Sequence, residues 1–291
     1  MAENIDTLLK ESRVYQPTAQ TKAAAYIQDY ESAYKKSIAD PEGFWSGVAK
    51  ELEWFSPWTK VLEWNYPWAK WFVGATCNIT YNCLDRHVKT WRKNKVAVIW
   101  VGENDQERVI TYGELYRQVN RCANALKTLG IEKGDRVTIY LPKVPEQIVA
   151  MLACARIGAI HSVVYSGFSA PALANRIQDA ESKLVITADV GFDRGKVLNL
   201  KPVVDQAVAN SPSVEHIVIL RRQTPGVTLS APKEIDWHDW LKNEKAVCEA
   251  EPLDAEHPLY ILYTSGTTGK PKGVVHVHGG YMVGTYITTK Y

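Results

Sequence analysis

The sequence predicts an α/β protein whose mainly parallel sheet is flanked by helices. From about residue 95 to residue 263, short runs of β-branched and apolar residues alternate with segments in which apolar residues recur at helical spacing. Strands that are separated by helices pair in parallel, and such sheets are covered on both faces. Because open α/β sheets bind ligands at the carboxyl ends of their strands, the segments that follow the strands are the first candidates for a site.

The strands are expected where apolar runs are bounded by turn residues. They span residues 96–101, 109–110, 137–141, 162–165, 184–187, 217–220 and 259–263. Asn104 and Asp105 form the turn between the first two strands.

The intervening helices carry start and stop signals. Thr111 and Glu114 form a capping box ahead of a helix that ends at Gly130. Pro145 opens a second helix, which ends at a glycine. A third helix begins at residues 169–171, where a serine and a proline provide the start signal.

The first ninety residues differ from the rest in their tryptophan content. Six tryptophans fall within 27 residues of one another, namely Trp45, Trp54, Trp58, Trp64, Trp68 and Trp71. Pro57 and Pro67 argue against one continuous helix there. We expect an aromatic-rich layer that packs over a larger domain, and we divide the chain into residues 1–90 and residues 91–291.

Composition narrows the class of protein. The 291 residues are 46% hydrophobic and 23% charged, which is typical of globular proteins. The 34 basic and 32 acidic residues give a net charge of +2, so no nucleic-acid partner is expected. The N-terminal sequence is polar, so no secretory signal is expected. No run of about 18 consecutive apolar residues is present, so no membrane partner is expected. Five scattered cysteines indicate reduced thiols, and we therefore expect a cytoplasmic protein.

The strongest functional signal is the glycine-rich segment from Tyr263 to Gly273, which follows the last expected strand. Its glycines allow tight turns that aim backbone N–H groups at an anion, and its hydroxyls and lysines add donors and positive charge. The candidate phosphate-binding residues are Thr264, Ser265, Gly266, Thr267, Thr268, Gly269, Lys270 and Lys272. The segment is not the P-loop of kinases, because only two residues separate Gly266 from Gly269 and a proline follows Lys270.

This segment resembles the phosphate-binding signature of the acyl-adenylate-forming enzymes, which include acyl-CoA synthetases, luciferases and peptide-synthetase adenylation domains. The resemblance implies that the loop holds the β- and γ-phosphates of MgATP while a carboxylate attacks the α-phosphorus. The implied products are an acyl-adenylate and pyrophosphate, after which the thiol of CoA displaces AMP. ATP, Mg²⁺ and CoA are therefore the expected cofactors and cosubstrates.

Other segments resemble the short-chain members of this group. Residues 78–87, with the sequence NITYNCLDRH, are similar to the N-terminal region of acetyl-CoA and propionyl-CoA synthetases, as are residues 165–169 and 279–281. The similarity runs from about residue 30 to the end. It implies the incomplete large N-terminal domain of an acyl-adenylate-forming enzyme. The implied reaction joins acetate to CoA and converts ATP to AMP and pyrophosphate, with propionate as the alternative substrate.

A second binding segment is implied by the same resemblance. The relatives carry an arginine-rich stretch that contacts the phosphates of CoA, and here the corresponding residues are Asp193, Arg194, Gly195 and Lys196. Arg194 can hold a phosphate through two hydrogen bonds, and Lys196 can add a point charge. Asp193 stands where an arginine is common in the family, so the resemblance implies one fewer cation at this position.

Three further groups carry less weight. His276 and His278 could face the same side of a strand as metal ligands, but the sequence offers no third ligand, so no metal site is assigned. No catalytic residue is assigned within this sequence. Asp85 beside His87 is expected to be structural, by resemblance. Ser166 is not a nucleophile elbow, because no glycine precedes it at the required spacing.

The resemblance also implies parts that this sequence does not contain. These parts are the acyl-pocket segment, the Thr-Glu motif near adenine and magnesium, an aspartate for the ribose, and a small C-terminal domain with the lysine that promotes adenylation. We therefore expect a truncated N-terminal part that is inactive alone, with a separate C-terminal polypeptide as a conceivable partner. Two alternatives stay open: a non-catalytic remnant that binds nucleotide or a partner, and, much more weakly, a phosphotransferase.

Overall fold

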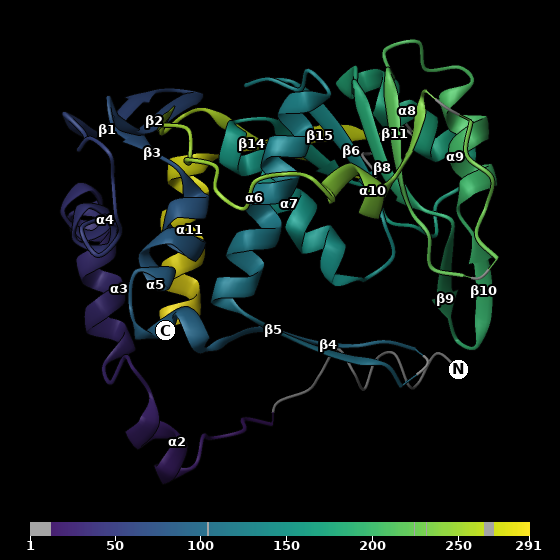
Figure 1. The fold of residues 1–291 in the computed structure, drawn as a ribbon. Helices are drawn as coiled ribbons and strands as arrows, with labels where there is room; N and C mark the ends of the chain where they lie inside the picture. Colours follow the sequence, from purple (N-terminus) through teal and green to yellow (C-terminus); the bar gives the residue numbers. More distant parts are fainter. Residues whose placement is uncertain (1–12, 104, 224, 231, 265–270) are drawn as a thin grey trace, which may run out of the picture.

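A seven-stranded sheet lies at the centre of the computed structural model, which describes residues 13–103, 105–223, 225–230, 232–264 and 271–291. Its strands are β6 (Arg136–Tyr140), β7 (Ile160–Val163), β8 (Leu184–Ala188), β11 (His216–Leu220), β12 (Glu234–Asp236), β14 (Pro258–Thr264) and β15 (Lys272–Val277). The strand order is β12-β11-β8-β6-β7-β14-β15. Figure 1 labels β6, β8, β11, β14 and β15 of this sheet. Every neighbouring pair is parallel except β14 and β15, so the predicted mainly parallel sheet is confirmed.

Helices cover both faces of this sheet. They are α6 (Tyr112–Thr128), α7 (Pro145–Ile157), α8 (Ala170–Ala180), α9 (Lys201–Val208) and α10 (Trp237–Leu241). In the sheet, β7 lies on one side of β6 and β8 lies on the other. The connection from β6 to β7 therefore runs in the opposite direction across the sheet to the connection from β7 to β8. Because such crossovers are right-handed, α7 and α8 lie on opposite faces. Accordingly, α6 packs on α7 and α8 packs on α9.

The helix boundaries follow the signals in the sequence. Thr111 Oγ1 accepts a hydrogen bond from the backbone N–H of Glu114 at 3.2 Å, and α6 begins at the next residue after Thr111. The helix α7 begins at Pro145 and ends at Gly158, whose φ of 76° lies in the left-handed region. Glycine adopts this conformation without a steric penalty, and it therefore stops the helix where the sequence predicts.

The main core lies between the sheet and these helices. The interior strand β8 is buried along its whole length. Val137 and Ile139 of β6 and Leu184, Val185 and Ile186 of β8 have no exposed surface. Full burial of one such side chain contributes roughly 1.5–3 kcal/mol. The hydrophobic effect on these strands therefore fixes the sheet on which the binding segments are mounted.

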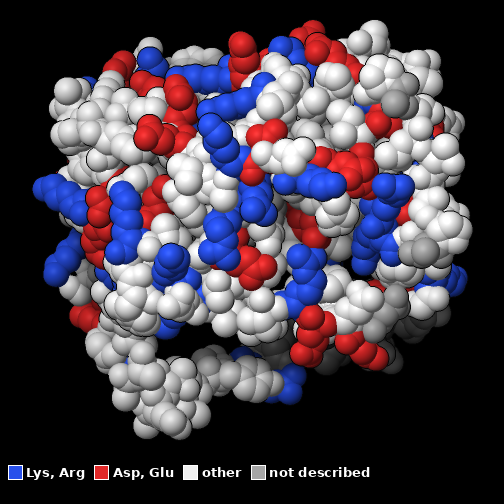
Figure 2. All heavy atoms as spheres, viewed as in Figure 1, with Lys and Arg blue, Asp and Glu red and all other residues white. Residues whose placement is uncertain are grey.

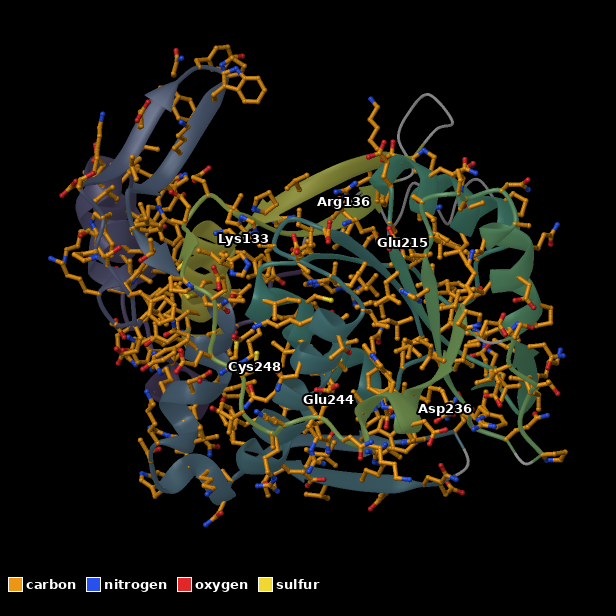
Figure 3. The ribbon with its side chains drawn as sticks, turned by 45° about the horizontal axis from the view of Figure 1, so that its top comes forward. Lys133, Arg136, Glu215, Asp236, Glu244 and Cys248 are labelled. Carbon is orange, nitrogen blue, oxygen red and sulfur yellow. The ribbon has the colours of Figure 1, made fainter. Side chains whose placement is uncertain are left out.

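The N-terminal part is built from short elements. They are α2 (Ala19–Ala24), α3 (Tyr30–Ala39), α4 (Pro41–Ala49), β1 (Lys60–Asn65), β2 (Trp68–Val73), β3 (Thr76–Cys77), a π-helix (Tyr81–Asp85), α5 (Arg86–Val88) and a 3₁₀-helix (Trp91–Asn94). As the prolines predict, this region is not one helix, and β1 and β2 pair as an antiparallel hairpin that stands out from the body (Figure 3).

The aromatic layer forms only in part. Trp54, Trp58 and Phe72 pack together with ring centroids 5.2 Å apart, in a core shared with α4 and α11 (His278–Lys290). In contrast, Trp64 and Trp68 near the end of the hairpin are 65% and 74% exposed. The expected aromatic layer does not extend to these two residues, because they lie on the part of the hairpin that projects beyond the core.

A buried ion pair ties the N-terminal part to the sheet domain. Arg156 of α7 is 1% exposed, and its two terminal nitrogens donate to the two carboxylate oxygens of Asp85 at 2.7 and 2.9 Å. Its Nε donates to the backbone carbonyl of Cys248 at 2.6 Å. The structural role expected for Asp85 follows from this geometry.

Two further hairpins, besides β1–β2, lie outside the main sheet in the described residues. The strands expected at 96–101 and 109–110 are present as β4 (Val96–Val101) and β5 (Glu107–Thr111), which pair with each other. The sequence does not predict β9 (Val190–Asp193) and β10 (Lys196–Asn199), which form the second hairpin. A two-residue strand, β13 (Leu253–Asp254), pairs with β3. The division of the chain at residue 90 stays a prediction.

The state of the cysteines and the character of the helices complete the description of the fold. The five cysteines are free thiols, and burial raises the pKa of Cys154 to about 12, so this thiol is unreactive at neutral pH. Throughout the described ranges, no helix combines the length and the apolar character needed to cross a bilayer.

Candidate functional site

The predicted phosphate loop connects β14 to β15. These two strands are antiparallel, and the last residue of β14, Thr264, pairs with the first residue of β15, Lys272. Both residues are exposed. The structure therefore brings together two of the eight predicted phosphate-binding residues at the base of the loop. The other six, Ser265, Gly266, Thr267, Thr268, Gly269 and Lys270, lie outside the described residues.

The end of β14 lies against α8. The hydroxyl of Tyr263 donates to Asp179 Oδ2 at 2.6 Å. The guanidinium carbon of Arg176 lies 5.5 Å from the centre of the Tyr263 ring and 4.6 Å from that of Phe168. Burial, together with the Asp179 carboxylate, raises the pKa of Tyr263, so its hydroxyl stays protonated at neutral pH. A pocket of about 380 Å³ opens beside these side chains and is bordered by Pro271.

The four residues predicted to contact CoA come together at the tip of the β9–β10 hairpin. Asp193 pairs with Lys196, and Arg194 and Gly195 form the turn between them, with φ values of 50° and 73°. Two-residue turns with positive φ at both central positions match the twist of the strands that they join. All four residues are exposed, so the two cations are presented to solvent together with the Asp193 carboxylate.

A second pocket, of about 280 Å³, lies beside this hairpin. Of the four predicted residues, only Asp193 lines it. Its charged and aromatic lining residues are Trp100, Glu103, Lys143, Tyr165, Phe192, Asp193 and Arg222. Lys143 follows β6, Tyr165 follows β7 and Arg222 follows β11, so this pocket occupies the carboxyl ends of parallel strands. The two pockets have no lining residue in common.

Arg222 is the main binding candidate that the sequence analysis missed. Its guanidinium carbon lies 4.9 Å from the centre of the Phe192 ring, and its backbone N–H donates to Asp189 Oδ1 at 2.8 Å. The same oxygen accepts from the backbone N–H of Val190 at 2.7 Å. The buried Asp189 therefore joins the segment after β11 to the start of the hairpin. The signal was present in the sequence, because Arg221 and Arg222 directly follow an apolar strand.

The two histidines set aside as metal ligands lie in different surroundings. His276 stacks on Tyr260 with ring centroids 4.6 Å apart, whereas His278 is fully buried and its Nδ1 accepts from the backbone N–H of Ile79 at 3.4 Å. In the part of the chain that the structure describes, no three His, Cys, Asp or Glu side chains gather as a metal-binding group.

Charge on the visible face does not form one binding patch. Figure 2 shows lysines and arginines interspersed with aspartates and glutamates over that face. Recognition of an anionic ligand on that face therefore depends on individual side chains at short range, because neighbouring charges of opposite sign offset one another and salt screens exposed charges beyond a Debye length of about 8 Å.

Comparison with known families identifies the superfamily to which this geometry belongs. The family model for the AMP-binding enzyme matches residues 84–290, which include both pockets and the loop. The chain belongs to the AMP-binding enzyme family. A second family model, for the acetyl-coenzyme A synthetase N-terminus, matches residues 30–83. The predicted resemblance to the acyl-adenylate-forming enzymes is confirmed.

Individual relatives point in the same direction. The chain is 49% identical to an acetyl-coenzyme A synthetase of Deinococcus radiodurans over 99% of its own length and 45% of that protein. It is 54% identical to an acetyl-coenzyme A synthetase of Methanothrix thermoacetophila, over 84% of this chain and 38% of that protein. The structure resembles the acetoacetyl-CoA synthetase from Streptomyces lividans with a TM-score of 0.84 and 30% identity, over 92% of this chain and 44% of the other. The chain thus spans less than half the length of these AMP-binding relatives.

Proposed function

We propose that this chain supplies the phosphate-binding loop and part of the CoA site of an AMP-forming acetate–CoA ligase. The observation that carries the proposal is the 49% identity to an acetyl-coenzyme A synthetase over 99% of the chain, a stretch that includes both candidate sites. The pairing of Thr264 with Lys272 supports it, because it holds the two ends of the loop side by side at the end of a sheet strand.

The proposed first half-reaction uses the loop to hold ATP. A carboxylate oxygen of acetate attacks the α-phosphorus, the bond to the β-phosphate oxygen breaks, and pyrophosphate leaves with the electron pair. Negative charge grows on the leaving group in the transition state. The ammonium of Lys272 and donors of the loop stabilise that charge, and one well-placed donor contributes roughly 3–4 kcal/mol.

The second half-reaction brings CoA to the acetyl-adenylate. The CoA sulfur attacks the acetyl carbonyl carbon, loses its proton and displaces AMP. We assign Arg194 and Lys196 to the CoA phosphates, and we add Arg222 and Lys143 from the adjacent pocket. Since Asp193 repels phosphate from the tip of the hairpin, the cations of the pocket offset the missing arginine.

Magnesium accompanies the ATP phosphates in this proposal and screens their charge. The family resemblance places its protein ligand in the portion of the relatives that this chain does not span. For the same reason we expect the 291-residue chain alone to give no acetate-dependent pyrophosphate exchange. A cytoplasmic location stays a prediction from the sequence.

The test joins this chain to the portion of the Deinococcus radiodurans relative that follows the matched region. This chimaera is called the reconstituted enzyme below. We expect it to exchange labelled pyrophosphate into ATP in the presence of acetate, and we expect Gly266→Leu to abolish that exchange. The relative itself is the positive control. A folded reconstituted enzyme without exchange would contradict the proposal.

A further inference from the structure

We propose that Asp179 and Arg176 of α8 are positioning residues for adenylate formation, which act through Tyr263 to fix the place where the phosphate loop begins. This inference rests on the proposed function. Tyr263 directly precedes Thr264, the first candidate phosphate-binding residue. A change in the position of the Tyr263 ring therefore moves the start of the loop.

The sheet alone does not fix the end of β14. Along its parallel neighbour β7, β14 has one registered pair, Tyr260 with His161, and residues 261–264 have no registered partner on that side. The other neighbour, β15, is the edge strand of the sheet in the described residues and pairs with β14 alone. The hairpin formed by these two strands therefore needs a further contact to locate Thr264 and Lys272 relative to the rest of the fold.

The helix α8 provides that contact from a firmly held position. At its C-terminal end, Arg136, the first residue of β6, donates through Nε to the carbonyl of Ala180 at 2.6 Å (Figure 3). One residue earlier, Asp179 accepts the Tyr263 hydroxyl at 2.6 Å. Hydrogen bonds from a hydroxyl to a carboxylate at this distance are among the strong ones in proteins. The bond therefore ties the end of β14 to the central sheet through α8.

Arg176 holds the same ring from a second direction. The residue is 8% exposed, one terminal nitrogen donates to the carbonyl of Ala172 at 2.6 Å, and the guanidinium contacts the rings of Phe168 and Tyr263. In the described part of the chain, no carboxylate lies within 4 Å of its guanidinium nitrogens. A buried cation without an ion pair is costly unless other contacts compensate it. Its placement between two aromatic faces supplies that compensation and fixes the plane of the Tyr263 ring.

Adenylate formation is sensitive to such placement, because a displacement of about 1 Å at the reacting groups lowers a rate by about 10²-fold. Pyrophosphate has left before CoA attacks, so the thioester step does not need the loop. Loss of the Tyr263 hydroxyl or of the Asp179 carboxylate should therefore slow the first half-reaction and spare the second. A residue that only stabilised the fold would affect both half-reactions alike.

The test uses the reconstituted enzyme and its Tyr263→Phe, Asp179→Ala and Asp179→Asn variants. We expect the first two to lower the rate of acetate-dependent pyrophosphate exchange about 10- to 100-fold, and to leave thioester formation from added acetyl-adenylate within about twofold. The Tyr263→Phe and Asp179→Ala double variant should be no slower than either single variant. Asp179→Asn should keep most of the activity, because its amide oxygen still accepts the hydroxyl.

Asp205→Ala is the matched control, since Asp205 is also an exposed helix carboxylate with a partner at 2.6 Å, Lys201 of α9, and does not contact β14. It should leave both half-reactions unchanged. Tyr263→Phe keeps the ring and so tests the inference even if Asp179→Ala does not fold. If the variants lose equal activity in both half-reactions, or if Tyr263→Phe exchanges pyrophosphate at the unchanged rate, the inference is overturned and the proposed function is not affected. Absence of exchange in the unchanged reconstituted enzyme would overturn the proposed function as well.

Discussion

Replacement of Asp85 by alanine is expected to destabilise the chain by about 3–5 kcal/mol, the usual result of removing one partner from a buried ion pair. Arg156 is 1% exposed, and both of its terminal nitrogens donate to Asp85. Without the carboxylate, the guanidinium keeps its bond to the Cys248 carbonyl and its place 5.3 Å from the centre of the Tyr116 ring, but its charge is left unpaired in the core.

The measurement is urea denaturation of the 291-residue chain, followed by tryptophan fluorescence. Glu181→Gln is the matched control, because Glu181 pairs with Arg136 at 3.1 Å but is 77% exposed, and exposed pairs contribute about 0–1 kcal/mol. Asp85→Asn, which keeps the size of the side chain, tests the charge if Asp85→Ala does not fold. A loss below about 1 kcal/mol in both Asp85 variants would refute the account of this ion pair.

The remaining predictions concern pH and the two half-reactions. Burial lowers the pKa of His161 to about 4. Between pH 6.5 and pH 4 the unfolded chain therefore binds a proton that the folded chain does not. The free energy of unfolding should fall by about 3 kcal/mol as the pH is lowered through that window. His161→Phe should remove that part of the slope in denaturation measured at several pH values; an unchanged slope would contradict it. In the reconstituted enzyme, Lys270→Ala should slow pyrophosphate exchange far more than thioester formation, and equal slowing would contradict the loop's role. Arg194→Ala and Arg222→Ala should each raise the apparent KM for CoA at least threefold and spare the exchange reaction; an unchanged KM in either variant would remove that residue from the CoA site.

Much of the fold could be predicted because the strongest local signals agree with the tertiary structure. The buried strand 184–187 is continuous and mainly β-branched, and it lies inside the sheet as β8, between β11 and β6. The turn and cap residues at Thr111 and Gly158 act within a few residues of chain, so their effect is visible in the sequence. The phosphate-binding role of the loop from Tyr263 to Gly273 follows from its composition together with the family resemblance, and it stays a prediction.

Features that depend on long-range contacts could not be predicted. The bond from Tyr263 to Asp179 spans 84 residues, and the pairing of Arg156 with Asp85 spans 71. Neither pair shows a local pattern, because each residue alone is an ordinary strand or helix residue. The β9–β10 hairpin was not predicted for a different reason. Its turn requires a positive φ at Arg194, which arginine rarely adopts, so the usual turn preferences of the residues do not indicate it.

The central claim is that this chain handles ATP as an adenylate-forming ligase does, with cleavage between the α- and β-phosphates. The most direct measurement is the nucleotide product that the reconstituted enzyme forms from ATP, acetate and CoA, separated by ion-exchange chromatography and matched to acetyl-CoA formed. The account predicts AMP and pyrophosphate in equal amounts with acetyl-CoA, and no product when Gly266→Leu is introduced. Formation of ADP and inorganic phosphate, or of AMP at an unchanged rate in Gly266→Leu, would contradict it.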